Sequence, residues 1–352
     1  MQWDLYCRVV DNFGDVGVAW RLAADLAGRG ESVRLAVDDA SALAWLAPRG
    51  APRVEVVAWD QRPSAAPDVV VELFGVGRPR AAWPAGARTP VLVNVEHLTA
   101  ERYAERSHAL PSPTSRPGEP ETTTWFYFPG FTPQSGGLLR EPGLIEQRRA
   151  FGDGAAWLAS LGIATRPGER RVVLFSYRND AIDALLDVLA AAPTLLLATP
   201  GPAIEQVAAR LGAPLARGAL RAVALPWLAQ VDFDRLLWSS DLNLVRGEDS
   251  FVRAIWAGAP FLWQLYVQDD GAQRAKLDAF LDRYLARADE PLAAAIRSAF
   301  LRWNGAPAGS LAALGDAAVA AAWSAHALAW RDALASQSDL ATRLLAFVEG
   351  KR

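Results

Sequence analysis

Residues 244–260 have the sequence LVRGEDSFVRAIWAGAP, which predicts a strand end, a tight turn and a short helix. Gly247 allows the turn, Asp249 or Ser250 can cap the helix, and Gly258 can end it. Such a turn directs backbone N–H groups and the positive end of a helix dipole beyond the carboxyl end of the strand. The stretch therefore predicts an α/β unit with an anion site at this edge of its sheet.

Arg246 adds a fixed positive charge at the same turn, so a diphosphate fits there. Glu248 and Asp249 are acidic, and carboxylates bind sugar hydroxyls well as paired acceptors. A ligand that carries both a diphosphate and sugar hydroxyls is a nucleotide sugar. The alternative is an ordinary capped strand-to-helix turn that binds no ligand.

Composition limits the class of protein. The chain has 352 residues, enough for two domains, and its 51% hydrophobic and 21% charged content is typical of a globular protein with a large core. The net charge of −3 argues against a nucleic-acid-binding protein, which is usually basic. An acidic protein can still bind a basic protein or a basic side chain.

Cys7 is the only cysteine, so no intramolecular disulfide can form and a reducing cytoplasm is the expected setting. The first residues lack the pattern of a signal peptide, and no apolar run approaches the roughly 18 residues needed to span a bilayer. We therefore expect a cytoplasmic monomer that binds neither a membrane nor a nucleic acid.

The first half of the chain alternates apolar runs with helical periodicity, which predicts a parallel sheet connected by helices. Residues 110–121 are rich in Pro, Ser and Thr, so we expect a long irregular loop there. We expect a dense aromatic strand at residues 125–131 and helical structure within residues 141–161. Other strands are expected at residues 5–10, 32–37, 54–59, 69–74 and 91–96, and helices at 18–26 and 38–46.

A polar segment with Pro and Gly at residues 165–169 is the expected domain boundary. After it the alternation begins again, and the chain is mostly helical from residue 271. We predict an α/β protein with two Rossmann-like domains facing a cleft, residues 1–165 and 166–335, with a last helix at about 336–352 crossing back onto the first. The second half has expected strands at residues 172–176, 194–199, 220–225 and 241–245, and helices at 181–191, 204–211 and 233–238.

The loop DNFGDVG at residues 11–17 follows the first expected strand, at the edge where open α/β sheets bind ligands. Asp11 and Asp15 straddle the turn, and Gly14 and Gly17 let the backbone approach a ligand closely. In the alternative interpretation Asp15 is only a helix cap and Asp11 only a turn former. The pattern is not a dinucleotide fingerprint, and the chain has no P-loop.

Phe175 and Tyr177 close the first strand of the second half and would share one face of an extended chain. They could enclose a nucleobase, and Gln230 in a comparable loop could hydrogen-bond to its edge. Core packing explains Phe175 equally well, and it explains Tyr177 less well.

Metal and nucleophile patterns are absent from the sequence. His97, His108 and His326 are scattered, and no His/Cys spacing suits zinc. We interpret His97 as structural or close to an acceptor, and Cys7 as a small buried residue within a strand. No Ser-His-Asp or Cys-His pattern occurs, so we expect no metal and no cofactor.

Several motifs together resemble one family, the bacterial protein-arginine rhamnosyltransferases that modify elongation factor P (EarP). The resemblance covers most of the chain and implies a GT-B glycosyltransferase fold that works without a metal. It also implies dTDP-β-L-rhamnose as donor, an arginine of elongation factor P as acceptor, and inversion at the anomeric carbon. The motifs are DNFGDVGV at 11–18, LPSP at 110–113, FPGFT at 128–132, GGLLRE at 136–141, FSY at 175–177 and RGEDSFVRA at 246–254.

The resemblance also implies roles for individual residues. The first domain would bind the acceptor, with Asp15 as the base and Asp11 as its companion, in a loop supported by Asn12, Phe13, Gly14 and Gly17. The second domain would bind the nucleotide sugar. Its implied donor residues are Phe175, Tyr177, Gln230, Arg246, Glu248, Asp249 and Ser250.

The chemistry is consistent with those roles. A guanidinium has a pKa of about 12.5–13.8, so a carboxylate serves best by orienting it and accepting its proton as the C–N bond forms. Our hypothesis is that Asp11 holds a second guanidinium nitrogen. Arg246 and the helix start near Ser250 would stabilise the leaving diphosphate without magnesium.

Two other functions stay open. One is a GT-B enzyme that uses another nucleotide sugar or another acceptor, such as a small molecule. The other is a non-catalytic adaptor that binds a nucleotide sugar and docks a translation factor. Paired carboxylates on the acceptor side argue against the adaptor, because binding a nucleotide sugar alone does not need them.

Overall fold

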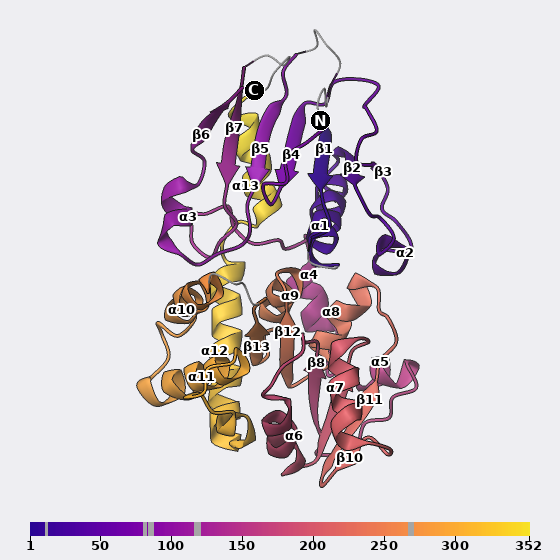
Figure 1. Ribbon diagram of the computed structural model, residues 1–352, viewed down its shortest axis with the longest axis vertical. Coiled ribbons are helices and arrows are strands. Elements are labelled where there is room, and N and C mark those ends of the chain that lie inside the picture. The colour runs from indigo at the N-terminus through magenta and orange to yellow at the C-terminus, as the bar shows by residue number, and fades with distance from the viewer. Residues whose placement is uncertain (11–12, 80–82, 84–87, 116–120, 267–270) are drawn as a thin grey trace. The chain divides into compact units, whose positions relative to one another are not determined.

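The computed structural model describes residues 1–10, 13–79, 83, 88–115, 121–266 and 271–352, the coloured parts of Figure 1. The chain forms two compact units, one of Met1–Leu144 with Ser336–Arg352 and one of Ile145–Ala335. Within the described residues, none of the helices combines the length and the apolar character needed to cross a membrane.

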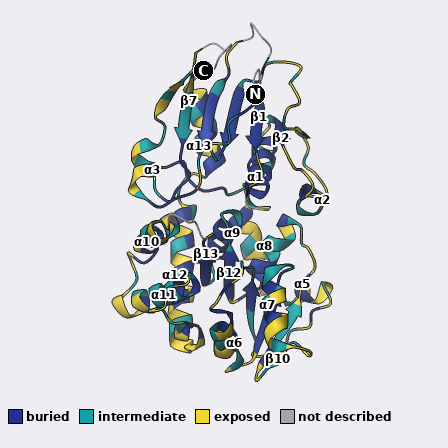
Figure 2. Ribbon diagram, in the orientation of Figure 1, coloured by how far each residue is buried: buried dark blue, intermediate teal, exposed yellow. Residues whose placement is uncertain are grey.

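The first unit is built on a sheet with the strand order β3-β2-β1-β4-β5-β7-β6 among the described residues. All neighbours pair in parallel except β6, which is antiparallel to β7. Figure 2 shows the central strands buried, as expected for a parallel sheet with near-continuous apolar strands. The strands are β1 (Gln2–Cys7), β2 (Ser32–Val37), β3 (Val54–Ala58), β4 (Val69–Leu73), β5 (Val91–Val95), β6 (Pro111–Thr114) and β7 (Thr122–Tyr127).

Two helices from opposite ends of the chain share the main core of this unit. Side chains of α1 (Gly14–Gly28) and α13 (Leu340–Glu349) pack with the strands in one apolar cluster, which includes the fully buried Trp3, Val16 and Leu344. The other described helices of the unit are short, α2 (Leu43–Leu46) and α3 (Arg102–Ser107).

Local hydrogen bonds explain two differences from the expected elements. The first strand ends at Cys7 rather than residue 10, because the N–H groups of Val9 and Val10 donate to the carboxylates of Asp38 and Asp15 instead of a neighbouring strand. The helix expected at residues 38–46 is shortened to α2, because the Asp39 carboxylate accepts the N–H of Ser41 in a turn.

The expectation of an irregular loop at residues 110–121 was wrong in part. Pro111–Thr114 form β6, which pairs along one side with β7 at the end of the sheet. Proline lacks an N–H group, and an edge strand tolerates this because it has only one paired side. Residues 116–120 of this segment lie outside the described residues.

The second unit has its own sheet, with the order β10-β11-β9-β8-β12-β13 and with only β10 antiparallel among the described strands. Its strands are β8 (Arg170–Leu174), β9 (Thr194–Ala198), β10 (Ala216–Arg217), β11 (Leu220–Ala224), β12 (Leu242–Arg246) and β13 (Phe261–Gln264). Its helices are α4 (Leu144–Ala150), α5 (Ala155–Ser160), α6 (Ile182–Ala190), α7 (Pro202–Leu211), α8 (Gln230–Trp238), α9 (Asp249–Ala257), α10 (Ala272–Tyr284), α11 (Glu290–Trp303), the short η1 (Ala312–Gly315) and α12 (Ala317–Ala335).

The chain divides after Leu144 and not after residue 165 as expected. Helices α4 and α5 therefore belong to the second unit, although a Pro/Gly segment follows them. Arg148 of α4 donates from Nε to the carbonyl of Ala257 at 3.1 Å, so its cation lies at the carboxyl end of α9. Leu158 of α5 is fully buried. These contacts outweigh the local boundary pattern.

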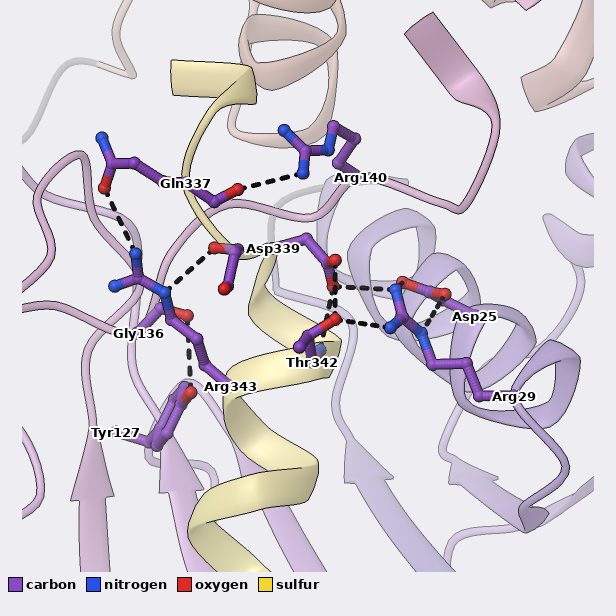
Figure 3. Close-up of polar contacts among 10 residues, drawn as sticks. Asp25, Arg29, Tyr127, Gly136, Arg140, Gln337, Asp339, Thr342 and Arg343 are labelled. Atoms are coloured by element: carbon purple, nitrogen blue, oxygen red, sulfur yellow. Dashed lines mark hydrogen bonds and ion pairs between the residues drawn. The ribbon is translucent and has the colours of Figure 1, made fainter. Parts of the chain in front are cut away.

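The segment Ser336–Arg352 packs against the rest of the first unit through apolar side chains and through polar contacts, some of which Figure 3 shows. The guanidinium of Arg343 donates to the carbonyls of Thr132 at 3.0 Å and Ser135 at 2.6 Å. The N–H of Leu340 donates to the carbonyl of Leu138 at 2.9 Å. The start of α13 is therefore held by the loop that follows β7.

Arg29, at the end of α1, joins α1 to α13 (Figure 3). It donates to Asp339 at 2.8 Å, to Thr342 at 2.6 Å and to Asp25 at 2.8 Å. Burial raises the pKa of Asp25 to about 6 even though Arg29 opposes the rise. The same Asp339 carboxylate accepts the N–H of Thr342 and so caps α13. One cation thus fixes the relative position of the two helices.

His108 is held as a neutral acceptor in this unit. Its Nδ1 accepts the N–H of Phe128 at 3.1 Å, and its ring packs edge-on against Tyr127. Burial, together with a smaller effect of the nearby Arg343 cation, lowers the pKa of His108 to about 4.

We expect the free energy of unfolding to decrease as the pH falls from about 6.5 to about 4, in part because of His108. The unfolded chain binds a proton on this histidine below its ordinary pKa of about 6.5, whereas the folded chain resists protonation until about 4. In His108→Asn, whose amide oxygen can accept the same hydrogen bond, the decrease should be smaller. Urea unfolding at pH 4.5 and pH 7.5 measures both proteins. Equal pH dependence of the two would contradict the assignment.

Candidate functional site

The turn between β12 and α9 has the form expected at an anion site. Gly247 adopts φ +68°, a left-handed conformation that favours glycine, and open space lies where a Cβ would project. The expected cap by Asp249 or Ser250 was wrong: α9 begins at Asp249, and Glu248 occupies the N-cap position without a side-chain capping hydrogen bond.

Arg246 lies over two aromatic rings. Its guanidinium carbon is 4.7 Å from the ring centre of Phe175 and 4.3 Å from that of Tyr177, so the two rings face the same side as predicted. The Nε atom is buried without a hydrogen-bond partner, and no ion pair to Arg246 occurs among the described residues. A cation held in this way is suited to an anionic ligand.

The two rings also contact their surroundings edge-on. Phe175 is half-buried and packs against Phe233 of α8 at 5.5 Å between ring centres. Tyr177 packs against Tyr266, which is 59% exposed, at 5.6 Å. The aromatic surface therefore continues from the half-buried Phe175 to the exposed Tyr266.

Gln230 lies at the first residue of α8 and is buried. Its Nε2 donates to the Asp249 carboxylate at 3.3 Å, which joins the starts of α8 and α9. Behind this contact, Arg253 makes a buried pair of hydrogen bonds to Asp234 at 2.7 and 2.8 Å. The structure thus brings Gln230 and Asp249 together, and the Arg253–Asp234 pair, which sequence reasoning did not anticipate, fixes the two helices that carry them.

Asp15 lies in the first turn of α1, at the carboxyl end of β1, and its side chain is buried. One carboxylate oxygen accepts the N–H of Val10 at 2.8 Å. The N-cap position belongs to Phe13, so the interpretation of Asp15 as an ordinary helix cap was wrong. The hydrogen bond orients the carboxylate toward the backbone of Val10.

The rest of this loop is described only in part. Phe13 packs edge-on against Trp45 at 5.1 Å, and Gly14 and Gly17 lie within the first turn of α1. Asp11 and Asn12, which we expected to act as the companion carboxylate and as loop support, lie outside the described residues.

The structure also places Cys7 and His97. Cys7 is buried in β1, where burial raises the pKa of its thiol above the ordinary value and the Asp15 carboxylate raises it further. His97 stacks on Phe74 with ring centres 4.3 Å apart. Within the part of the chain that the structure describes, no three His, Cys, Asp or Glu side chains are grouped so that they could hold a metal ion.

Comparison with known proteins identifies the family. The sequence model described as "Elongation-Factor P (EF-P) rhamnosyltransferase EarP" matches residues 3–349. The chain belongs to the EarP family. It is 43% identical to the protein-arginine rhamnosyltransferase of Pseudomonas aeruginosa, with 98% of each chain covered. It is 32% identical to the enzyme of that name from Shewanella oneidensis, with 99% of this chain and 97% of the relative covered.

Solved structures agree with this assignment. A structure of EarP-mediated arginine glycosylation of translation elongation factor EF-P matches with a TM-score of 0.73 and 32% identity, covering 100% of this chain and 99% of that one. A UDP-glucosyltransferase from Polygonum tinctorium matches with a TM-score of 0.53 and 14% identity, over 99% and 98% of the chains, which shows a shared fold only. The predicted GT-B fold of two Rossmann-like units and the predicted family are thereby confirmed.

Proposed function

We propose that this EarP-family chain is an inverting glycosyltransferase that moves L-rhamnose from dTDP-β-L-rhamnose to an arginine side chain of elongation factor P. Family membership supports rhamnosyl transfer to arginine. The single structural observation that carries the proposal is Arg246, a cation above Phe175 and Tyr177 at the turn before α9.

The donor site follows from these contacts. Arg246 and the first N–H groups of α9 supply positive charge and donors for the diphosphate. The rings of Phe175 and Tyr177 provide an apolar surface for the base. The polar side chains at the starts of α8 and α9 serve the base edge and the sugar hydroxyls, and they are Gln230, Glu248, Asp249 and Ser250.

On the acceptor side, Asp15 serves as the base. Removing a guanidinium proton outright near pH 7 would cost about 8 kcal/mol, so Asp15 accepts the proton as the new bond forms. The arginine nitrogen attacks the anomeric carbon, the bond from that carbon to the diphosphate oxygen breaks, and dTDP leaves with the electron pair. Attack opposite the leaving group inverts the anomeric carbon, and Arg246 stabilises the charge that develops on the diphosphate.

Intact-mass measurement of elongation factor P tests the proposal directly. After incubation with this protein and dTDP-β-L-rhamnose, we expect a gain of one deoxyhexose, located on an arginine by fragmentation. If no gain occurs while calorimetry still detects dTDP binding, the donor site stands and the acceptor is wrong. Donor hydrolysis without transfer to protein would favour a GT-B enzyme with a small-molecule acceptor.

Asp11→Asn tests the second carboxylate. If Asp11 holds a second guanidinium nitrogen, turnover should fall by about tenfold or more while dTDP affinity stays at the wild-type value, because the residue belongs to the acceptor side. Steady-state transfer rates and calorimetry give the two quantities. Unchanged turnover would eliminate the role that we propose for Asp11.

Removal of metal ions should leave the transfer rate unchanged. In the proposed site, the Arg246 guanidinium and the amino end of α9 neutralise the leaving diphosphate. A divalent cation is therefore not needed to stabilise its charge. The measurement is the initial rate with excess EDTA against the rate with added Mg²⁺. A rate that depends on added Mg²⁺ would contradict this donor site.

A further inference from the structure

The end of β13 contacts both parts of the proposed donor site. Trp263 donates from its indole nitrogen to the carbonyl of Gly247 at 2.9 Å, so it holds the turn between β12 and α9. Its ring stacks flat on Phe251 of α9, with ring centres 3.9 Å apart and an interplanar angle of 4°. The Trp263 side chain is buried, and the contact fixes the direction of the Gly247 peptide.

Gln264 holds the other part of the site. It pairs in register with Arg246, and β12 lies between β13 and β8 in the sheet. Its side chain reaches past the end of β12: Oε1 accepts the N–H of Tyr177 at 2.9 Å, and Nε2 donates to the carbonyl of Arg178 at 3.2 Å. Both ends of this buried amide therefore bind the backbone that carries Tyr177.

The segment that makes these contacts is itself fixed from α11. Asn304, at the end of that helix, donates from Nδ2 to the carbonyl of Trp263 at 2.9 Å. Its Oδ1 accepts the N–H of Leu265 at 2.9 Å. The backbone on both sides of Gln264 is thus held by one side chain, so the position of β13 is transmitted to the Gly247 turn and to Tyr177.

We propose that Trp263 and Gln264 are positioning residues for the nucleotide-sugar site, acting through the Gly247 carbonyl and the Tyr177 backbone. This inference rests on the proposed function, because it assigns a purpose to contacts around the donor site. The indole N–H of Trp263 and the amide of Gln264 both bind backbone groups of the proposed site. Trp263 holds the turn that presents the α9 amides, and Gln264 holds the backbone of Tyr177, over whose ring Arg246 lies. Ligand affinity depends on this turn and this ring being in place before the ligand binds.

Trp263→Phe tests the first contact with little other change. It removes one N–H donor and keeps an aromatic ring on Phe251, but it leaves the Gly247 carbonyl without its indole partner. We expect the Kd for dTDP and the KM for the donor to rise about five- to tenfold, while kcat and the KM for elongation factor P stay near wild type. Calorimetry and steady-state kinetics measure these constants.

Trp323→Phe is the matched control. The indole of Trp323 donates to the Tyr284 hydroxyl at 2.9 Å, is also buried, and belongs to the same unit. The control makes the same chemical change without touching Gly247 or Tyr177, so dTDP affinity should not change. Equal loss of dTDP affinity in both variants would show a general packing effect and overturn the inference.

Gln264→Met gives a second, independent variant of similar shape that removes both hydrogen bonds to the backbone around Tyr177. It should also raise the Kd for dTDP, with the midpoint of thermal unfolding close to wild type. If both Trp263→Phe and Gln264→Met bind dTDP with wild-type affinity, this inference is overturned but the proposed function is not. Failure of the wild-type protein to bind dTDP overturns the proposed donor, and the inference with it.

Discussion

Replacing Asp15 by Asn is expected to lower rhamnosyl transfer to elongation factor P by about 10²- to 10⁴-fold. The amide oxygen of Asn can still accept the N–H of Val10, so the loop before α1 should keep its conformation. In the proposed mechanism, the variant loses the ability to take a proton from the guanidinium as the bond forms. Intact-mass time courses give the rate, and calorimetry should show unchanged dTDP affinity.

Asp38→Asn is the control for this change. Asp38 follows β2 and accepts the N–H of Val9 at 2.9 Å, so it supports the same loop through a similar bond. The Asp38→Asn variant should transfer rhamnose at a rate near that of the wild type. If Asp15→Asn keeps more than about a tenth of the wild-type rate, or if Asp38→Asn loses as much activity, Asp15 is not the base.

Replacing Arg246 by Gln is expected to weaken dTDP binding by about 10²-fold, through the loss of charge-assisted hydrogen bonds to the diphosphate. The rings of Phe175 and Tyr177 remain, so affinity for thymidine without phosphates should change much less. Comparing the loss of affinity for dTDP with that for thymidine separates the effect of the Arg246 charge from the effect of its contact with the rings. Titration calorimetry with dTDP and with thymidine measures both.

Arg178→Gln is the matched control for Arg246→Gln. Arg178 is close in the chain to Tyr177, but its side chain is 74% exposed and pairs with the exposed Glu205 at 2.9 Å. The variant removes the same charge from the same unit and should bind dTDP with nearly wild-type affinity. A similar loss in both variants would indicate that net charge, and not the Arg246 site, sets the affinity.

The two ends of α1 have different tasks in this molecule. Its amino end carries Asp15, and its carboxyl end is joined through Arg29 to Asp339 and Thr342 of α13. The helix that carries the proposed base is therefore fixed by the last segment of the chain. This gives the segment Ser336–Arg352 a role in the first unit beyond covering its core.

Local sequence patterns predicted most of the strands and helices, and they predicted the turn at Gly247. Apolar periodicity, glycine and proline act within a few residues, so they can be recognised without knowing the fold. The same patterns failed where contacts with residues distant in the sequence determine the local structure. Pro111 and Pro113 suggested a loop, but pairing with β7 makes this segment an edge strand.

The motif residues were identifiable from the sequence, but their arrangement was not. That Arg246 lies over Phe175 and Tyr177 follows from the pairing of β12 with β8. No pattern near Gln264 indicates that its amide holds Tyr177, which lies 87 residues earlier in the chain. Neither glutamine nor tryptophan near a strand end is unusual, so the sequence contains no local signal for such a contact.

By itself, the sequence determined that this is an α/β protein with two Rossmann-like halves, and which motifs carry charge and aromatic rings. Only the tertiary structure decided where the units divide, how Arg29 joins α1 to α13, and which side chains hold the Gly247 turn. The physical reason is the separation along the chain between the residues that interact. Backbone propensity and periodicity are properties of neighbouring residues, whereas buried hydrogen bonds and ion pairs depend on which distant segments the sheet order brings together.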